Sequence, residues 1–176
     1  SSGANRASAV AATSRTSSSL ECVASRRTAV AVSTSVDRGR AAAAAATGRV
    51  ALLEATCNQV NQEGGYTGQR PADFARQVRA YAAQHGLAPQ RLLLGGDHLG
   101  PNPWRHLPAA EALARSETMV ADYVAAGFTK LHLDTSMACA DDPPGPLAPE
   151  TIAHRAARLA VAAESAARGS GPDGPS

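Results

Sequence analysis

The chain has few of the features that disulfide-rich, membrane-spanning or nucleic-acid-binding proteins need. Its three cysteines, Cys22, Cys57 and Cys139, show no CxxC spacing, which argues against a disulfide framework or a structural zinc site and predicts a cytoplasmic location. No apolar run approaches the roughly 18 residues of a transmembrane helix. A net charge of +2, with a single lysine, does not indicate the cluster of positive charge that binds nucleic acid. We therefore predict neither a membrane nor a nucleic-acid partner.

Aromatic residues are also scarce, at 3% of a chain that is 44% hydrophobic. Much of that hydrophobic content is alanine, which buries little area per residue, so the predicted core is thin. The 176 residues fit one globular domain, since domains of about 100–150 residues are the most common.

The composition divides the chain into three parts. Residues 1–48 are rich in Ser, Ala and Arg and poor in acids, and we interpret them as a disordered, low-complexity leader; a degraded first strand–helix unit and an organellar transit peptide are the alternatives. Residues 49–168 form an organised block, and residues 169–176 are predicted to be a disordered tail.

The central block alternates strands with helices three times. Apolar runs predict strands at residues 49–56, 91–97 and 128–134, and helical periodicity predicts helices at residues 71–86, 108–126 and 149–168. Strands that are apolar on both faces are typical of parallel sheets covered by helices, and long loops that only follow the strands are typical of a (β/α)8 barrel. We predict an α/β fold, specifically a partial TIM barrel of roughly the first half; a doubly wound sheet remains open. Uncovered strand edges would leave the isolated chain marginally stable or prone to aggregation.

Polar side chains gather where the predicted strands end, at Glu54, Asp97 and Asp134. Asp97 precedes His98, a pair suited to acid–base chemistry and metal binding, although a loop-capping Asp beside a backbone-bonded His fits the pattern equally. His132 lies two residues before Asp134 and therefore shares its strand face. It could bind a metal, or it could be a buried histidine that is hydrogen-bonded to Asp134.

A glycine-rich polar loop follows the first predicted strand of the block, and backbone amides in such loops can hold phosphate. The sequence has no GxxxxGK[ST] motif, so this is not a P-loop. Substrate or phosphate binding is predicted for Glu54, Asn58, Gln59, Gly64, Gly65 and Asp134.

Several long runs resemble the GatZ/KbaZ family, the partner subunits of class II D-tagatose-1,6-bisphosphate aldolase, which were earlier labelled tagatose 6-phosphate kinases. The resemblance covers about residues 49–168, and its main runs are LEATCNQVNQ (53–62), GGYTG (64–68), RPADF (70–74), LGGDHLGPN (94–102) and YVAAGFTKLHLD (123–134). It implies a TIM-barrel subunit without aldolase activity of its own, which stabilises a catalytic partner subunit in galactitol or N-acetylgalactosamine breakdown.

The catalytic class II aldolases are similar at the Asp97–His98 pair, where their Asp transfers protons and their His binds zinc. The resemblance therefore implies Asp97 as a catalytic residue, His98 as a ligand of an incomplete metal site, and zinc supplied through the partner subunit. His132 is a further candidate metal ligand from its strand position, not from the resemblance. Met137 stands where the aldolase pattern has another His. A metal-dependent sugar-phosphate aldolase, a tagatose 6-phosphate kinase and a non-functional fragment are the alternative functions.

Overall fold

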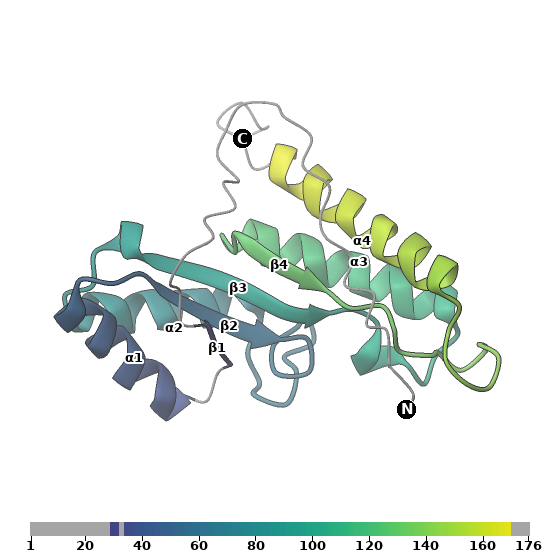
Figure 1. Ribbon diagram of the computed structural model, residues 1–176, viewed down its shortest axis with the longest axis horizontal. Helices are drawn as coiled ribbons and strands as arrows, with labels where there is room; N and C mark the ends of the chain where they lie inside the picture. The colour runs from purple at the N-terminus through teal and green to yellow at the C-terminus, as the bar shows by residue number, and fades with distance from the viewer. Residues whose placement is uncertain (1–28, 32–33, 170–176) are drawn as a thin grey trace, which may run out of the picture.

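The computed structural model describes residues 29–31 and 34–169, in which strands and helices alternate four times (Figure 1). The strands are β1 (Ala29–Ala31), β2 (Ala51–Thr56), β3 (Leu92–Leu99) and β4 (Lys130–Leu133). The helices are α1 (Thr34–Thr47), α2 (Pro71–Gln84), α3 (Ala109–Ala125) and α4 (Pro149–Gly169). Two short 3-10 turns, at Pro89–Arg91 and Asn102–Trp104, lie in the connections.

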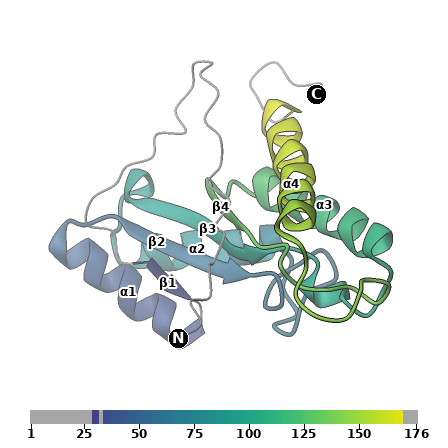
Figure 2. The same cartoon turned by 45° about the vertical axis from the view of Figure 1, so that its right-hand side comes forward.

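The four strands form one parallel sheet in the order β1-β2-β3-β4, so each strand pairs with the one before it in the chain. The helices follow the same order, since α1 packs on α2, α2 on α3, and α3 on α4 (Figures 1 and 2). Right-handed crossovers between sequentially adjacent parallel strands place successive helices on the same face of a sheet. The α/β fold with a parallel sheet is therefore confirmed, and the order of the four strands in the described residues contains no reversal of the kind that defines a doubly wound sheet.

The core lies between this sheet and the helices. Leu53 of β2 and Leu94 of β3 pack there with Phe74 of α2 and Tyr123 of α3, and all four side chains are buried. The Tyr123 hydroxyl donates to the Val60 carbonyl oxygen at 2.9 Å, which satisfies the one polar atom of a buried ring. This packing anchors the loop after β2 to α3.

Alternate residues of the strands point away from this core. Leu131 and Leu133 of β4 pack against the core, whereas Lys130 and His132 lie on the opposite face, where they contact acidic side chains of β2 and β3. The period of two therefore gives the sheet an apolar face under the helices and a charged face opposite.

The prediction of a disordered leader is wrong for residues 29–31 and 34–47, which form a strand–helix unit. The alanine run of α1 carries no contrast between apolar and polar positions, so it shows no periodicity, although alanine is the strongest helix former. Ala41 and Ala44, three residues apart, are buried. The rest of the predicted leader, residues 1–28 and 32–33, and residues 170–176 of the predicted tail lie outside the described residues.

The six predicted elements of the central block are confirmed with small shifts at their ends. No end shifts by more than two residues; β3, for example, continues to Leu99, two residues beyond the predicted end. Among the helices of the described ranges, none combines the length and the apolar character that crossing a bilayer demands.

Candidate functional site

A distortion at the end of β3 brings Asp97 and His98 together. Neighbouring residues of a regular strand point to opposite faces, but the pairing of β3 with β4 shifts register between Gly96 and Leu99, and His98 has φ +50°. His98 Nδ1 consequently lies 2.9 Å from Asp97 Oδ2. A positive φ in a non-glycine residue is uncommon, and such strained positions concentrate at functional sites.

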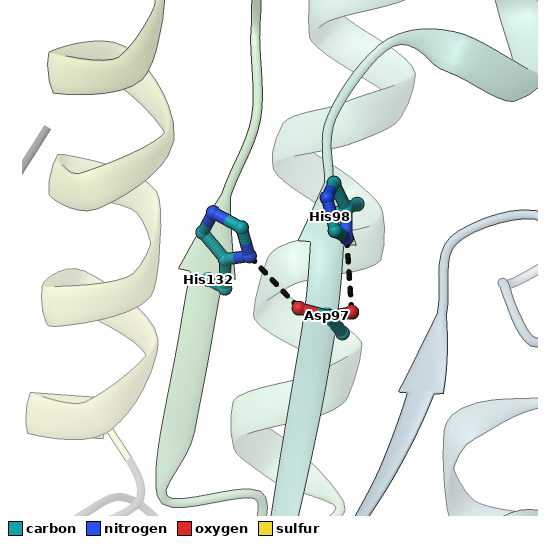
Figure 3. Close-up of side chains that lie close together, drawn as sticks. All are labelled: Asp97, His98 and His132. Atoms are coloured by element: carbon teal, nitrogen blue, oxygen red, sulfur yellow. Dashed lines mark hydrogen bonds and ion pairs between the residues drawn. The ribbon is translucent and has the colours of Figure 1, made fainter. Parts of the chain in front are cut away.

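His132 of β4 approaches the same carboxylate from the neighbouring strand. Its Nδ1 lies 2.8 Å from Asp97 Oδ1, and the two imidazole rings are 4.6 Å apart between centroids (Figure 3). Burial raises the pKa of Asp97, but the hydrogen bonds with His132 and His98 outweigh it and hold that pKa below its usual value. Asp97 is therefore an ionised carboxylate held between two histidines.

A lysine and a buried glutamate extend this charged cluster toward β2. Lys130 Nζ lies 2.5 Å from Glu54 Oε1 and 3.7 Å from Asp97 Oδ1. The Glu54 side chain is only 7% exposed, so Lys130 supplies the countercharge that a buried carboxylate needs. Gly95, which is paired with Glu54 in the sheet, leaves the room for it, because a Cβ there would lie 2.6 Å from Glu54 Oε1. Sequence reasoning missed Lys130, although its spacing of two from His132 placed it on the same face.

Asp134 stands just beyond β4 and beside the same cluster. Its Oδ1 accepts hydrogen bonds from the Ser136 hydroxyl at 2.7 Å and the Ser136 amide at 3.0 Å. Burial raises the pKa of Asp134, but these bonds and the charges of the two histidines bring it below the usual value. The loop after β3 lies directly against it, since a Cβ on Gly100 would clash with the Asp134 carbonyl oxygen.

The predicted binding residues of the glycine-rich loop mainly shape the loop itself. Gln59 Oε1 accepts from the Thr56 amide, and the Gln59 carbonyl oxygen accepts from the Thr67 hydroxyl. Gly65 has φ +52°, and a Cβ there would clash with that same carbonyl oxygen. Gly64 is buried in the loop and Asn58 is exposed. A role of these residues in binding substrate or phosphate stays a prediction.

The Cys57 thiol is buried and contacts the backbone of His98. Its thiol donates to the His98 carbonyl oxygen at 3.0 Å, and burial raises its pKa to about 11. The thiolate, which is the reactive form, is therefore almost absent at neutral pH. Sequence reasoning also passed over Asn61, a buried side chain that accepts from the amides of Glu63 and Gly65 and so holds the loop.

Fold and site together define the class: an α/β protein whose parallel strands carry ionisable side chains toward one edge of the sheet. The sequence model of the family described as D-tagatose-1,6-bisphosphate aldolase subunit GatZ/KbaZ-like matches residues 12–175. The chain belongs to this family.

Two of its relatives carry different functional names. The chain is 59% identical over 119 residues to D-tagatose-1,6-bisphosphate aldolase subunit GatZ of Escherichia coli strain SMS-3-5, which is 68% of this chain and 28% of that protein. It is 55% identical over 128 residues to D-tagatose 6-phosphate 4-epimerase of Agrobacterium fabrum, which is 73% of this chain and 30% of that protein.

A solved structure shares the fold at high sequence identity. The crystal structure of a probable tagatose 6 phosphate kinase from Sinorhizobium meliloti 1021 matches with a TM-score of 0.75 and 52% identity, over 78% of this chain and 36% of that one. The chain thus spans about a third of the length of the relatives it matches.

Proposed function

We propose that this chain forms the first part of a (β/α)8 barrel and serves in the cytoplasm as a GatZ-type, non-catalytic subunit of a D-tagatose-1,6-bisphosphate aldolase. The observation that carries the proposal is the 57–59% identity to proteins named as that subunit over 68% of this chain. The partner is then the catalytic class II aldolase subunit, and the ligand class is a sugar phosphate.

The strand order supports a barrel. A barrel is a sheet in which every strand lies beside its predecessor and all helices cover the outer face, and β1 to β4 with α1 to α4 follow that order. In a closed barrel the charged face of this sheet would line the interior, and the carboxyl ends of its strands would form the mouth, where barrel enzymes bind their ligands.

The charged cluster supports binding of a polar ligand at that mouth. Lys130 is 42% exposed and supplies a cation, while Glu54 and Asp134 supply acceptors for sugar hydroxyls. Asp97 is ionised and faces two imidazoles, which suits it to the proton transfer that the second function below requires and that the subunit role does not.

Co-expression with the catalytic subunit of the Escherichia coli aldolase tests the subunit role. We expect the two proteins to co-purify and the half-life of aldolase activity at 50 °C to increase at least about twofold. The variant Asp97→Asn should protect the aldolase equally, because a stabilising subunit needs no proton transfer. Absence of both co-purification and protection would contradict the proposal.

A second function, 4-epimerisation of a ketose 6-phosphate, is favoured by the Asp97 cluster and by the 55% identity to a protein of that name. Inversion at C4 can proceed by removing the proton of the 4-hydroxyl, breaking the C3–C4 bond into an enolate and an aldehyde, and re-forming the bond on the other aldehyde face. Asp97 with a neighbouring imidazole would accept and return that proton.

NMR of D-tagatose 6-phosphate incubated with the chain distinguishes the two functions. Epimerase activity predicts the C4 epimer as product, a loss of at least about 100-fold with Asp97→Asn, and no change with His85→Gln, which alters an exposed histidine outside the cluster. A kinase of the P-loop type is not supported, since the sequence contains no GxxxxGK[ST] motif.

A further inference from the structure

Lys130 is the only lysine of a chain that carries 17 lysine and arginine residues in all. It lies in β4, and its Nζ is 2.5 Å from Glu54 Oε1 and 3.7 Å from Asp97 Oδ1. We propose that Lys130 forms a Schiff base with the keto carbon of an open-chain ketose phosphate. This proposal rests on the sugar-phosphate ligand class of the proposed function and adds a covalent step to it.

Neutralisation of Glu54 does not by itself explain a lysine at this position. The nearly buried carboxylate of Asp142 is paired with Arg155, whose Nη1 and Nη2 lie 2.9 and 2.6 Å from its two oxygens. An arginine thus holds a carboxylate through two hydrogen bonds, whereas Lys130 makes one short contact with Glu54. A lysine amine can add to a carbonyl group, and a guanidinium, which stays charged in proteins, does not.

The lysine is open to a ligand, while the carboxylate beside it is enclosed. The side chain of Lys130 is 42% exposed on the charged face of the sheet, and that of Glu54 is only 7% exposed. Gly95 is part of this arrangement, because a Cβ there would collide with the Glu54 side chain. A ligand on this face can therefore contact Nζ while Glu54 keeps its own contact with the same atom.

Glu54 can serve first as the base and then as the acid of this reaction. It accepts one proton from the ammonium group of Lys130, with which it is already in contact. The free amine then adds to the keto carbon, and the carbonyl oxygen takes a second proton from the nitrogen, which gives a carbinolamine. Glu54 returns its proton to the new hydroxyl group, which leaves as water while the C=N bond forms. The ammonium group and the ketone thus become a protonated imine and water.

The charge of the site is the same before and after this reaction. The protonated imine carries one positive charge, as the ammonium group did, so the buried Glu54 carboxylate keeps its countercharge. In the epimerisation considered above, the imine would accept the electron pair of the breaking C3–C4 bond, and an enamine would take the place of the enolate. Asp97, whose Oδ1 lies 3.7 Å from Nζ, would accept the proton of the 4-hydroxyl group.

Reductive trapping of the untagged 176-residue chain tests the proposal. The chain is incubated with D-tagatose 6-phosphate, and sodium borohydride is then added to reduce any imine to a stable secondary amine. We expect mass spectrometry to show a gain equal to the mass of the sugar phosphate less one oxygen atom. Peptide mapping should place this gain at Lys130 and not at the α-amino group.

Two variants serve as controls. Lys130→Arg keeps a positive charge beside Glu54 and should lose the adduct, because a guanidinium forms no imine with the ketone. Arg76→Lys introduces an exposed lysine on α2, at a position that is ion-paired with Asp73. This surface lysine should be labelled at least about tenfold less than Lys130, since it has no buried carboxylate to transfer protons. Circular dichroism shows whether each variant keeps its helical content.

The proposal is overturned if the original chain gains no mass at Lys130, or if the introduced surface lysine is labelled as strongly as Lys130. Saturation-transfer NMR with the same sugar phosphate separates this failure from a failure of the proposed function. Binding without an adduct overturns the covalent step alone, whereas absence of both binding and adduct overturns the sugar-phosphate ligand class as well. The subunit role is tested separately by co-expression.

Discussion

Replacing Arg155 by methionine will test the ion pair that joins the loop after β4 to α4. Arg155 donates from Nη1 and Nη2 to the two oxygens of Asp142, at 2.9 and 2.6 Å, and the two side chains are 8% and 9% exposed. Asp142 also accepts from the Cys139 amide at 2.7 Å, which stabilises the turn of that loop. Arg155→Met keeps much of the side-chain volume but leaves the Asp142 carboxylate buried without its cation.

We expect this change to lower the free energy of unfolding by about 3 kcal/mol, the lower end of the range for a broken buried pair, because the loop lies near the surface and water can reach it. That is a large part of the roughly 5–15 kcal/mol of a typical domain. The double variant Asp142→Asn/Arg155→Met should lose only about 1 kcal/mol, since no charge is then left uncompensated.

The effect has a defined pH dependence. The hydrogen bond from Arg155 holds the pKa of Asp142 below its usual value, so the pair stabilises the folded state fully above the unfolded Asp pKa of about 3.9. This stability is lost as the pH falls through the lower folded pKa. The difference between the original chain and Arg155→Met should therefore be constant from pH 5 to 8 and shrink below about pH 4.

Urea unfolding followed by circular dichroism at 222 nm measures the free energy of unfolding of each variant at each pH. The single variants Arg155→Met and Asp142→Asn, with the double variant, form a mutant cycle. A loss below about 1 kcal/mol for Arg155→Met, or a double variant less stable than that single variant, would refute the reasoning.

Three further substitutions test the core and the charged face by the same urea measurement. Leu53→Ala, at a side chain that is 1% exposed, should cost about 2–5 kcal/mol, and a cost under 1 kcal/mol would mean that Leu53 is not in the core. Gly95→Ala should cost about 1–3 kcal/mol by displacing Glu54, and the loss should be smaller when Glu54 is also replaced by alanine. Lys130→Met should cost about 1–3 kcal/mol because it leaves Glu54 buried and unpaired, and adding Glu54→Gln should recover part of the loss.

Local pattern was enough to predict most of the fold. Apolar runs with polar ends marked β2, β3 and β4, and a period near 3.6 marked α2, α3 and α4. The pattern failed at α1, where an alanine-rich helix buries its small side chains without any alternation of polarity. A helix of that kind is decided by propensity and by packing against α2, and neither leaves a periodic signal.

Part of the candidate site was also predictable. Asp97 and His132 end neighbouring strands of a parallel sheet, and such ends meet at one edge. Lys130 could have been added by the alternation of β4, because it is two residues from His132. The pairing of Lys130 with Glu54 could not have been predicted, because the two residues are 76 positions apart in the chain and their contact depends on the register of the strands.

The amino-acid sequence by itself therefore determined which ionisable residues stand at the ends of which strands, because hydrophobic periodicity and strand alternation are local properties of the chain. Only the tertiary structure decided that His98 turns to the same side as Asp97. Strand alternation places those neighbours on opposite faces, and it is the register shift against β4, with a positive φ at His98, that brings both imidazoles onto one carboxylate.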